Sequence, residues 1–418
     1  MPVDAALAPV APGERLQSLD VVRGFALLGI LLMNMEGFVG PTWSAGGGID
    51  PALGGLDRWA DGLIYLLVQG KFYTLFSLLF GMGFAVMSQR AETAGRDFAG
   101  VYWRRGLVLL GIGLLHAVLV WSGDILVAYA LLSFFLLAFR PLRGGWLVVL
   151  ALLAYAAPSA LMLMIGAVGS LMQLDPQAAS GWNEMMSEQQ KMMASLIEAQ
   201  RQAFGNGSWL EAVRQRLQDL GLALTNLTMV GPQVFGMFLL GAWFVHSGAI
   251  VQPQRFPRLY AALRWIALPA GLAAMGLSIA LQPDMSVLRF DLRSGFAYSL
   301  AMLAGLLLCL AYLAWLLRGL QSPRGRRLLA WLAPAGRMAL SNYLLQSLVC
   351  TWVFYGYGLG YFEQLPRAWQ VPFALALFCA QVLLSRAWLA RFRFGPAEWV
   401  WRSLTYLKPQ PMRQTVAA

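Results

Sequence analysis

The sequence has little charge, almost no histidine and few cysteines. Only 12 % of its 418 residues are charged and two are histidines, whereas 59 % are hydrophobic, and the mean hydropathy is +0.60. A soluble globular protein carries roughly 25 % charged residues, so the composition excludes that class. It predicts instead a protein that crosses a membrane several times.

The scarcity of cysteine and the spread of the basic residues exclude two further classes. Cys309, Cys350 and Cys379 fall inside apolar runs without a CxxC spacing, so we expect neither a disulfide framework nor a metal site. The net charge of +11 is scattered among hydrophobic segments and forms no basic stripe with interleaved aromatics. We therefore expect no nucleic-acid partner.

Windows of about 20 apolar residues predict ten membrane spans. They predict an all-α, polytopic transmembrane helical bundle with both termini in the cytoplasm. The spans are residues 19–38, 63–87, 105–121, 125–139, 146–171, 229–247, 262–281, 296–317, 337–357 and 370–390.

The distribution of arginine and lysine sets the orientation of these spans. With the N-terminus in the cytoplasm, the inside segments carry more than twice as many basic residues as the outside segments. Half of the basic residues on the outside lie in one long loop, and the positive-inside rule gives little weight to long loops. This bias supports ten spans with both termini inside and turns the loop around Asp124 outward.

The longest segment between spans divides the chain into three regions. Residues 173–228 hold two amphipathic runs, MMSEQQKMMASLIEAQRQAF and SWLEAVRQRLQDLGLAL, broken by a Gly-Asn-Gly sequence. We expect this loop to lie along the outer interface or to cap the bundle, with a substrate-gating lid as the alternative. A five-span region, 1–172, precedes it and another, 229–418, follows it.

A helical hairpin from Arg104 to Arg140 carries the first candidate site. His116 lies inside its first apolar run, about 7.5 Å deeper than Trp121 at the helical rise. Asp124 follows the tip, and Tyr129 returns to a similar depth as His116, where it could hydrogen-bond to it. A histidine inside a membrane is costly unless it has a partner, so it is a functional candidate; a structural polar contact is the alternative.

The first span carries its polar residues on one narrow stripe. Asp20, Arg23 and Asn34 lie at offsets of 0, 3 and 14 residues, which at 100° per residue places them on one side of a helix. Asp20 and Arg23 can pair at the cytoplasmic end. They are candidate substrate-binding residues, although a helix cap and a snorkelling arginine would explain them equally.

Two later spans contain further candidate substrate-binding residues. Lys71 is too deep to snorkel, so it should pair with an acid, namely Asp57, Asp61 or Asp124, or bind an anionic ligand. Asn342 and Gln346 lie four residues apart on one helix face, which suits either a cavity lining or hydrogen bonds between helices.

Motifs throughout the chain resemble the bacterial DUF418 (YeiB-like) membrane-protein family. The resemblance covers nearly the whole sequence and implies a fold more than an activity, as well as a place in the bacterial inner membrane. It rests on RLQSLDVVRGFALLGILLMNM, KFYTLFSLLFGMGF, RRGLVLLGIGLLHAVLVWSGDILVAYAL, PQVFGMFLLGAW, APAGRMALSNYLLQS and FRFGPAEWVWRSLTY.

The LDxxRGxA motif of the first span also resembles heparan-α-glucosaminide N-acetyltransferase and, more distantly, the acyltransferase-3 membrane proteins. That resemblance implies transfer of an acyl group from a cytosolic acyl-CoA to an acceptor by means of a histidine. Asp20 and Arg23 match the motif. The histidine does not carry over, because in those relatives it lies near the first two spans, where this chain has none.

These observations favour a membrane acyltransferase with no bound cofactor, using acyl-CoA as its donor substrate. His116 would be the general base or a transient acyl carrier, oriented by Asp124 or Tyr129, while Arg23 and Lys71 would bind anionic groups. A transporter for a small metabolite or a lipid-linked group is the alternative, and a structural or sensory membrane protein is the third. The expected partners are the lipid bilayer and a small-molecule or lipid-linked substrate; the sequence leaves the oligomeric state open.

Overall fold

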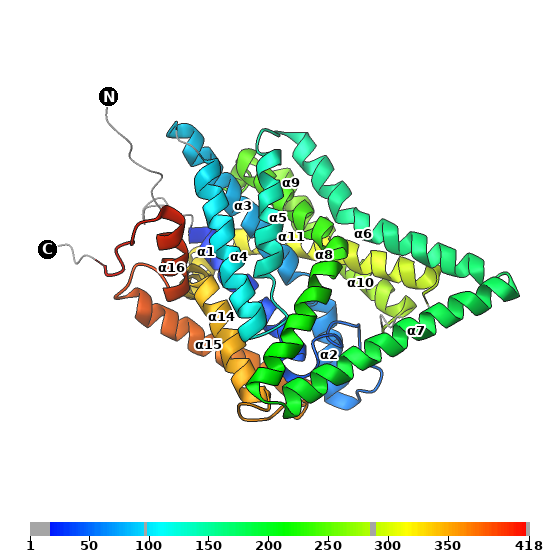
Figure 1. The fold of residues 1–418 in the computed structure, drawn as a ribbon. Helices are drawn as coiled ribbons and strands as arrows, with labels where there is room; N and C mark the ends of the chain where they lie inside the picture. The colour runs from blue at the N-terminus through cyan, green and yellow to red at the C-terminus, as the bar shows by residue number, and fades with distance from the viewer. Residues whose placement is uncertain (1–16, 96–97, 285–289, 415–418) are drawn as a thin grey trace.

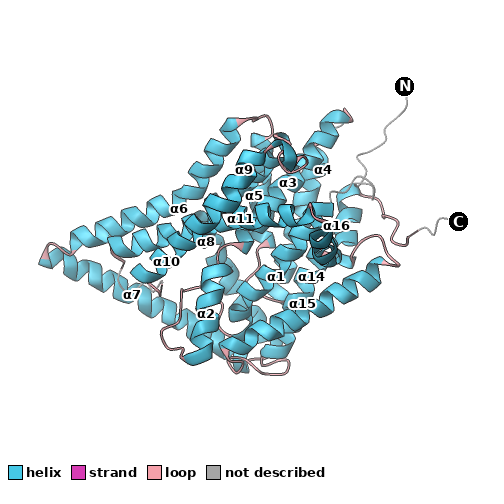
Figure 2. Ribbon diagram, turned by 180° about the vertical axis from the view of Figure 1, so that it is seen from behind, coloured by secondary structure: helices cyan, strands magenta, loops and turns pink. Residues whose placement is uncertain are grey.

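The computed structural model describes residues 17–95, 98–284 and 290–414, and these residues are almost entirely helical (Figure 2). No strand forms within the described ranges, which contain only two isolated bridges, Gly48 with Asp284 and Phe392 with Arg413. The prediction of an all-α bundle is confirmed.

Sixteen α-helices make up the described part of the chain. They are α1 (Gln17–Val39), α2 (Gly55–Leu67), α3 (Phe72–Thr93), α4 (Ala99–Leu119), α5 (Leu126–Leu136), α6 (Gly145–Met172), α7 (Pro176–Gln200), α8 (Trp209–His246), α9 (Pro257–Ala262), α10 (Leu268–Leu281), α11 (Leu292–Leu320), α12 (Pro323–Leu329), α13 (Ala333–Arg337), α14 (Ala339–Phe354), α15 (Arg367–Leu389) and α16 (Pro396–Tyr406).

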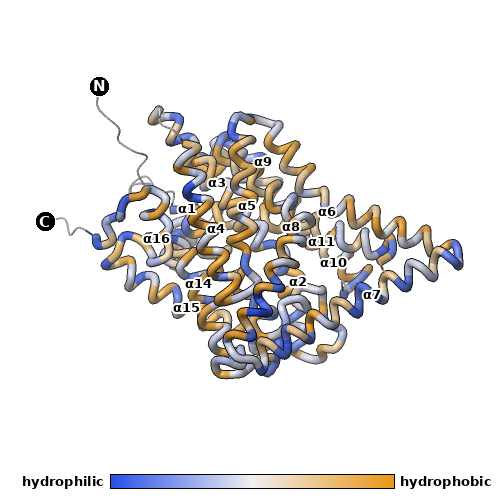
Figure 3. Tube along the Cα trace, viewed as in Figure 1, coloured by the Kyte–Doolittle hydropathy of each residue, from blue (hydrophilic) through white to orange (hydrophobic). Residues whose placement is uncertain are grey.

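Ten apolar helical segments coincide with the ten predicted spans. Within the described residues, eight are long and apolar enough to cross a membrane by length and composition, and α5 and α14 are shorter apolar helices. This is the structure of a membrane protein. Figure 3 shows the apolar residues concentrated along these helices, with hydrophilic residues gathered at their ends and along α7.

The second predicted span, 63–87, is interrupted in the structure. α2 ends at Leu67 and α3 begins at Phe72, because Gly70 takes a φ of +81°, a left-handed conformation that favours glycine. The buried amine of Lys71 donates to the carbonyl of Tyr65 at 2.7 Å and so satisfies a buried carbonyl in the last turn of α2.

The sixth predicted span begins twenty residues earlier than expected. Ser208 and Glu211 form a capping box that starts α8 at Trp209, and the helix continues to His246 through Pro232. The boundary expected at residue 229 therefore falls inside one continuous helix. The second amphipathic run of the outer loop is the first part of α8.

Close helix packing depends on glycine at a few contacts. A Cβ on Gly81 of α3 would collide with the backbone of Phe238 on α8, and one on Gly241 would collide with the backbone of Leu78. At the start of α1, Gly24 approaches Leu332, and Gly336 approaches Asp20 in the same way. These contacts hold α3 against α8 and α1 against α13.

Segments predicted to share the cytoplasmic side meet at one end of the bundle. The Arg143 guanidinium pairs with Glu92 at 3.0 Å, and Arg104 Nε donates to the carbonyl of Thr405 at 3.1 Å. The first contact links the end of α3 to the segment after α5, and the second links the start of α4 to α16. We call this the predicted cytoplasmic end.

Segments predicted to lie outside meet at the opposite end. Trp43 Nε1 donates to Asp219 at 3.2 Å, and Arg201 Nε donates to Glu363 at 2.8 Å. α7 runs from the tip of α6 back across this end of the molecule (Figure 1). The predicted amphipathic helix of the outer loop therefore forms part of what we call the predicted outer end.

Candidate functional site

His116 and Asp124 form a buried pair near the outer end of α4. His116 Nδ1 lies 2.6 Å from Asp124 Oδ2, and both side chains are at most 2 % exposed. The second carboxylate oxygen, Oδ1, accepts the backbone amide of Val127 at 2.8 Å in the first turn of α5. The tip of the hairpin thus fixes the carboxylate, and the carboxylate fixes the imidazole ring.

The other ring nitrogen of His116 is free. Nε2 is buried and has no hydrogen-bond partner among the described residues. The ring of Tyr343 on α14 lies 5.2 Å from the imidazole, centroid to centroid, and its hydroxyl is likewise buried without a partner. When Nδ1–H donates to the Asp124 carboxylate, Nε2 carries the lone pair, so it can accept a proton or attack a carbonyl carbon.

Tyr129 does not join this pair. Its hydroxyl lies 2.8 Å from Ser77 Oγ and donates to the carbonyl of Tyr73 at 3.0 Å. The depth expected for Tyr129 placed it near His116, but the side chain points toward α3. It contributes instead to the wall of a cavity.

This cavity of about 330 Å³ lies between α1, α3, α4, α5, α13, α14 and α16. Its predicted cytoplasmic end is cationic, because five arginines and only two carboxylates lie there. Apolar side chains from α1, α3, α4 and α5 cover most of its length. The charged residues are Arg23, Arg90, Arg105, Arg337, Arg402, Asp20 and Glu398.

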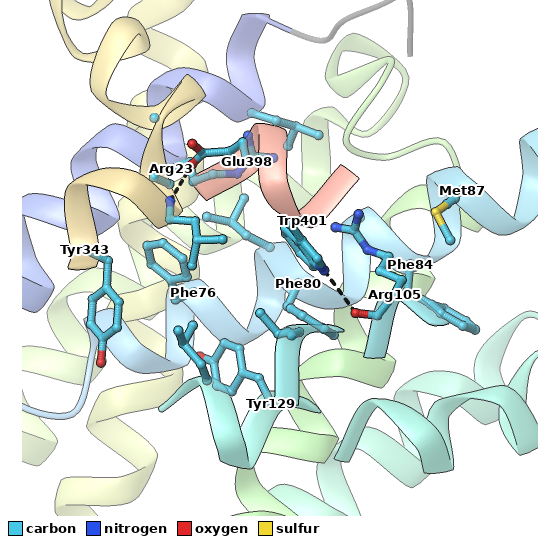
Figure 4. Close-up of a pocket in the computed structure, with 18 of the residues that line it drawn as sticks. Arg23, Phe76, Phe80, Phe84, Met87, Arg105, Tyr129, Tyr343, Glu398 and Trp401 are labelled. Carbon is cyan, nitrogen blue, oxygen red and sulfur yellow. Dashed lines mark hydrogen bonds between the residues drawn. The ribbon is translucent and has the colours of Figure 1, made fainter. Parts of the chain in front are cut away.

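The aromatic residues along the cavity lead from the arginines toward His116. Figure 4 shows Arg23 and Glu398 in the upper part of the view, Tyr343 at the left and Tyr129 below, with Phe76 and Phe80 between them. Tyr343 lines the cavity and also faces the His116 ring. The cavity therefore ends one side chain away from the imidazole.

α16 forms one side of the predicted cytoplasmic end of the cavity. Trp401 Nε1 donates to the carbonyl of Arg105 at 3.0 Å, and the Arg105 guanidinium stacks on the Trp401 ring with 3.7 Å to the centroid (Figure 4). This cation–π contact joins α16 to α4. The C-terminal helix is therefore part of the cavity wall.

A partly buried carboxylate, Glu398, holds α16 to the start of α14. Glu398 accepts the backbone amides of Leu340 at 2.7 Å and Ser341 at 3.1 Å, together with the Ser341 hydroxyl at 2.5 Å. Burial raises the pKa of the Glu398 carboxyl above its ordinary value, although the hydrogen bonds from Ser341 lower it.

Asp20 and Arg23 lie at the mouth of this cavity. Arg23 donates to the Asp20 carboxylate at 2.7 Å, and both side chains line the cavity. The predicted pairing is present. Asn34, on the same stripe, is partly buried near the outer end of α1 and lies outside the cavity lining.

The other candidate substrate-binding residues form hydrogen bonds outside the cavity. Asn342 donates to Ser385 Oγ at 2.8 Å, and Gln346 donates to Gln381 at 2.9 Å, so both join α14 to α15. Lys71 bonds to the Tyr65 carbonyl and forms no ion pair with a carboxylate of the described residues. None of the three lines the cavity, and their contacts are those of interhelical and end-of-helix bonds.

The described residues contain no group of three histidine, cysteine or carboxylate side chains that could hold a metal ion. Cys309 and Cys350 are buried in the apolar core, and Cys379 is exposed. The cationic end of the cavity suits an anionic ligand, because arginine binds phosphate and carboxylate groups.

Comparison with known proteins places this architecture in a family. The chain is 32 % identical to the uncharacterized protein YxaH of Bacillus subtilis, with 98 % of each chain covered, and 33 % identical to the uncharacterized protein YeiB of Escherichia coli, with 94 % of this chain and 96 % of the relative covered. The model of the family described as protein of unknown function, DUF418, matches residues 244–408. The chain belongs to the DUF418 family. No solved structure matches it.

The DUF418 match covers α14 and α16, which supply several of the cavity residues that the sequence did not predict. Arg90, Arg105, Arg337 and Arg402 were interpreted as markers of topology, because charge next to a span has that meaning by default. Glu398, Trp401 and Tyr343 stand in two of the motifs that carry the family resemblance, so those motifs were a signal for them.

Proposed function

We propose that this DUF418 protein is an acyltransferase of the bacterial inner membrane, which moves an acyl group from cytosolic acyl-CoA to an acceptor at the outer side. One observation carries the proposal: a single cavity joins an arginine-rich end to Tyr343, which faces the His116–Asp124 pair. An enzyme that draws its donor from one side needs such a connection between the donor site and the reactive group.

The cationic end of the cavity would hold the donor. Coenzyme A carries phosphate groups at one end and its thioester at the other, so the arginines would bind the phosphates and the apolar wall would surround the pantetheine arm. Arg23, held by Asp20 at the mouth, would contribute one of these contacts. Lys71 has no part in the donor site, because it lies outside the cavity.

His116 would supply the proton transfer at the closed end. Nε2 takes the proton of an acceptor hydroxyl or amine, whose oxygen or nitrogen then attacks the thioester carbonyl. The carbon–sulfur bond breaks, and the proton passes from Nε2 to the departing thiolate to give free coenzyme A. The Asp124 carboxylate stabilises the imidazolium between these two proton transfers.

The same nitrogen could instead carry the acyl group for a moment, in which case Nε2 itself attacks the thioester. Rapid acid quenching after mixing with labelled acyl-CoA separates the two roles. A label bound to His116 indicates the acyl carrier, and its absence during active turnover indicates the general base.

The chain provides a matched control for the central experiment, because it has only one other histidine. His246 ends α8 and is not among the residues that line the cavity. Purified protein in vesicles would be given labelled acyl-CoA, and release of coenzyme A would be measured for the wild type, His116→Ala and His246→Ala.

We expect release of coenzyme A by the wild type and His246→Ala, and a loss of about 10²- to 10⁴-fold in His116→Ala, the size of a general-base contribution. Equal rates in His116→Ala and the wild type would refute the role of His116. If no acyl-CoA is consumed while a solute crosses the vesicle membrane, the protein is a transporter.

A further inference from the structure

A second hollow lies on the other side of His116 from the donor cavity. It has a volume of about 300 Å³ and is formed by the outer ends of α4 and α14, the start of α8 and Tyr357. In Figure 1 these helix ends lie on the near face of the molecule, at the end opposite α16. The other residues in its wall are Leu119, Val120, Trp209, Leu348, Thr351 and Trp352.

The two hollows follow one another along α4 and along α14, and His116 lies at the level between them. On α4, Leu109 lines the donor cavity and Leu119 lines the second hollow, with His116 between them. On α14, Tyr343 lines the first and Leu348 lines the second. The amide of Val120 donates to the carbonyl of His116 at 2.9 Å, so the second hollow begins within one helical turn of the imidazole.

The second hollow opens sideways, where membrane lipid would contact the bundle. Leu115 on α4 and Leu348 and Trp352 on α14 are more than half exposed, although they are apolar residues of spanning helices. Side chains of this kind on a spanning helix face lipid. A hydrocarbon chain can therefore enter between α4 and α14, and a hollow of about 300 Å³ holds part of one chain while the rest stays in the bilayer.

A buried arginine stands behind the wall of the hollow. Arg216 is fully buried, donates to the carbonyl of Leu119 at 3.1 Å and to the Tyr357 hydroxyl at 2.8 Å, and its Nε has no partner among the described residues. It takes part in none of the ion pairs of the described chain; instead it faces aromatic rings, including that of Tyr355 at 5.5 Å. Its positive charge therefore favours an anionic group at the outer rim of the hollow.

We propose that this hollow binds the acceptor, a glycerophospholipid of the outer leaflet whose headgroup carries a phosphate and a free hydroxyl, as in phosphatidylglycerol. The acyl chain lies between α4 and α14, the phosphate lies at the rim near Arg216, and the headgroup hydroxyl reaches toward His116. This inference rests on the proposed acyltransferase function for its reaction, but the binding of lipid does not depend on it.

In the reaction, the headgroup oxygen forms a bond to the acyl carbon of the donor as the carbon–sulfur bond breaks. The hydroxyl proton passes through His116 Nε2 to the thiolate. The products are an acylated phospholipid and free coenzyme A, so no oxidant, reductant or further reactant is needed.

Lipid binding can be measured without turnover by native mass spectrometry of the full chain in detergent. Phosphatidylglycerol is the probe, and phosphatidylcholine, which has a phosphate but no free hydroxyl or net charge, is the comparison. Leu348→Trp places a larger side chain at the opening. Leu384→Trp on α15 is the matched control, because Leu384 is also an exposed leucine, 61 % against 52 %, and lines neither hollow.

We expect the wild type and Leu384→Trp to retain phosphatidylglycerol in preference to phosphatidylcholine, and Leu348→Trp to bind it about tenfold more weakly. Arg216→Gln tests the charge and should abolish the preference while the protein still binds donor. Equal retention of the two lipids by the wild type, or equal binding by Leu348→Trp and Leu384→Trp, would overturn the proposal.

Turnover separates this inference from the proposed function. Acylated phosphatidylglycerol should form on addition of acyl-CoA, and Leu348→Trp should lose it while still binding donor. Consumption of acyl-CoA without specific lipid binding would overturn the lipid site alone. Specific lipid binding without consumption of acyl-CoA would leave the lipid site and refute the acyltransferase.

Discussion

The His116–Asp124 pair places a proton acceptor where water has little access. Both side chains are almost fully buried and 2.6 Å apart, and only Nε2 of the imidazole remains without a partner. A buried pair of this kind is a costly way to connect two helices, since an apolar contact would serve as well. Its arrangement is that of a base with an orienting carboxylate.

Replacing the orienting carboxylate should affect the rate more than binding. In Asp124→Asn the amide can no longer hold the imidazole in the tautomer with the proton on Nδ1, so we expect kcat to fall by about 10³- to 10⁴-fold with little change in KM. Steady-state kinetics of coenzyme A release would measure both. Tyr129→Phe is the control, because its hydroxyl bonds to α3; an equal loss there would contradict the assignment.

The arginine at the mouth should affect donor binding instead. Arg23→Gln removes one charge-assisted contact, worth about 1.5–3 kcal/mol, and should raise the KM for acyl-CoA by about tenfold or more with kcat nearly unchanged. Lys71→Met removes a cation that is more deeply buried than Arg23 and lies outside the cavity, so its KM should stay at the wild-type value. A KM that rises in Lys71→Met but not in Arg23→Gln would contradict the assignment of donor binding to Arg23.

For individual residues, the sequence predicted the contacts between side chains that are close in the chain. It missed the contacts between side chains that are far apart in the chain. His116 with Asp124 and Asp20 with Arg23 are separated by eight and three residues, so helix and hairpin geometry were enough. Tyr129 faces α3 because of the rotation of α5, which depth alone does not give. Asn342 and Gln346 face α15 rather than the cavity, and only the packing of α14 decides between the two.

Among the elements, α16 has the largest consequence for the site. It is a short helix outside the spans, yet it contributes Glu398, Trp401, Arg402 and Tyr406 to the cavity. Its attachment through Glu398 buries a carboxylate whose pKa lies above the ordinary value. The docking of α16 therefore depends on pH.

The direction of this pH dependence follows from the direction of the pKa shift. Because the docked state holds the Glu398 proton more tightly than a detached α16 would, docking is strongest at low pH and weakens as the pH rises from the ordinary carboxyl range through the raised pKa. Amide hydrogen exchange of α16, corrected for the intrinsic rate at each pH, would measure this. Glu398→Gln should remove the dependence, and an unchanged dependence would assign it to another group.

The contact of α3 with α8 provides a test of the packing. Gly81→Ala forces a methyl group into the backbone of Phe238 and should destabilise the fold by about 1–3 kcal/mol, as overpacking does. Gly83 lies on the same helix with open space around its Cα. Gly83→Ala should therefore keep the wild-type midpoint of thermal unfolding; an equal decrease for both would contradict the close approach of α3 and α8.

For the whole molecule, the sequence predicted the helical bundle and the positions of ten apolar segments, because long apolar runs leave few alternatives in a membrane. It missed the break at Gly70 and the length of α8, since both depend on local backbone geometry within runs that remain apolar or amphipathic. The sequence did not predict the cavity, because seven helices, several of them far apart in the sequence, form its wall.

The central claim is that the cavity is the path by which a cytosolic donor reaches His116. One measurement tests it directly. An acyl-CoA with a photoreactive diazirine at the end of its acyl group would be bound to the purified protein and irradiated, and the labelled peptides would be identified by mass spectrometry. We expect label on the residues that surround the closed end, Leu126 on α5 and Tyr343 on α14, and its loss in the presence of excess unlabelled acyl-CoA. Label confined to residues outside this cavity, or label that unlabelled acyl-CoA does not displace, would contradict it.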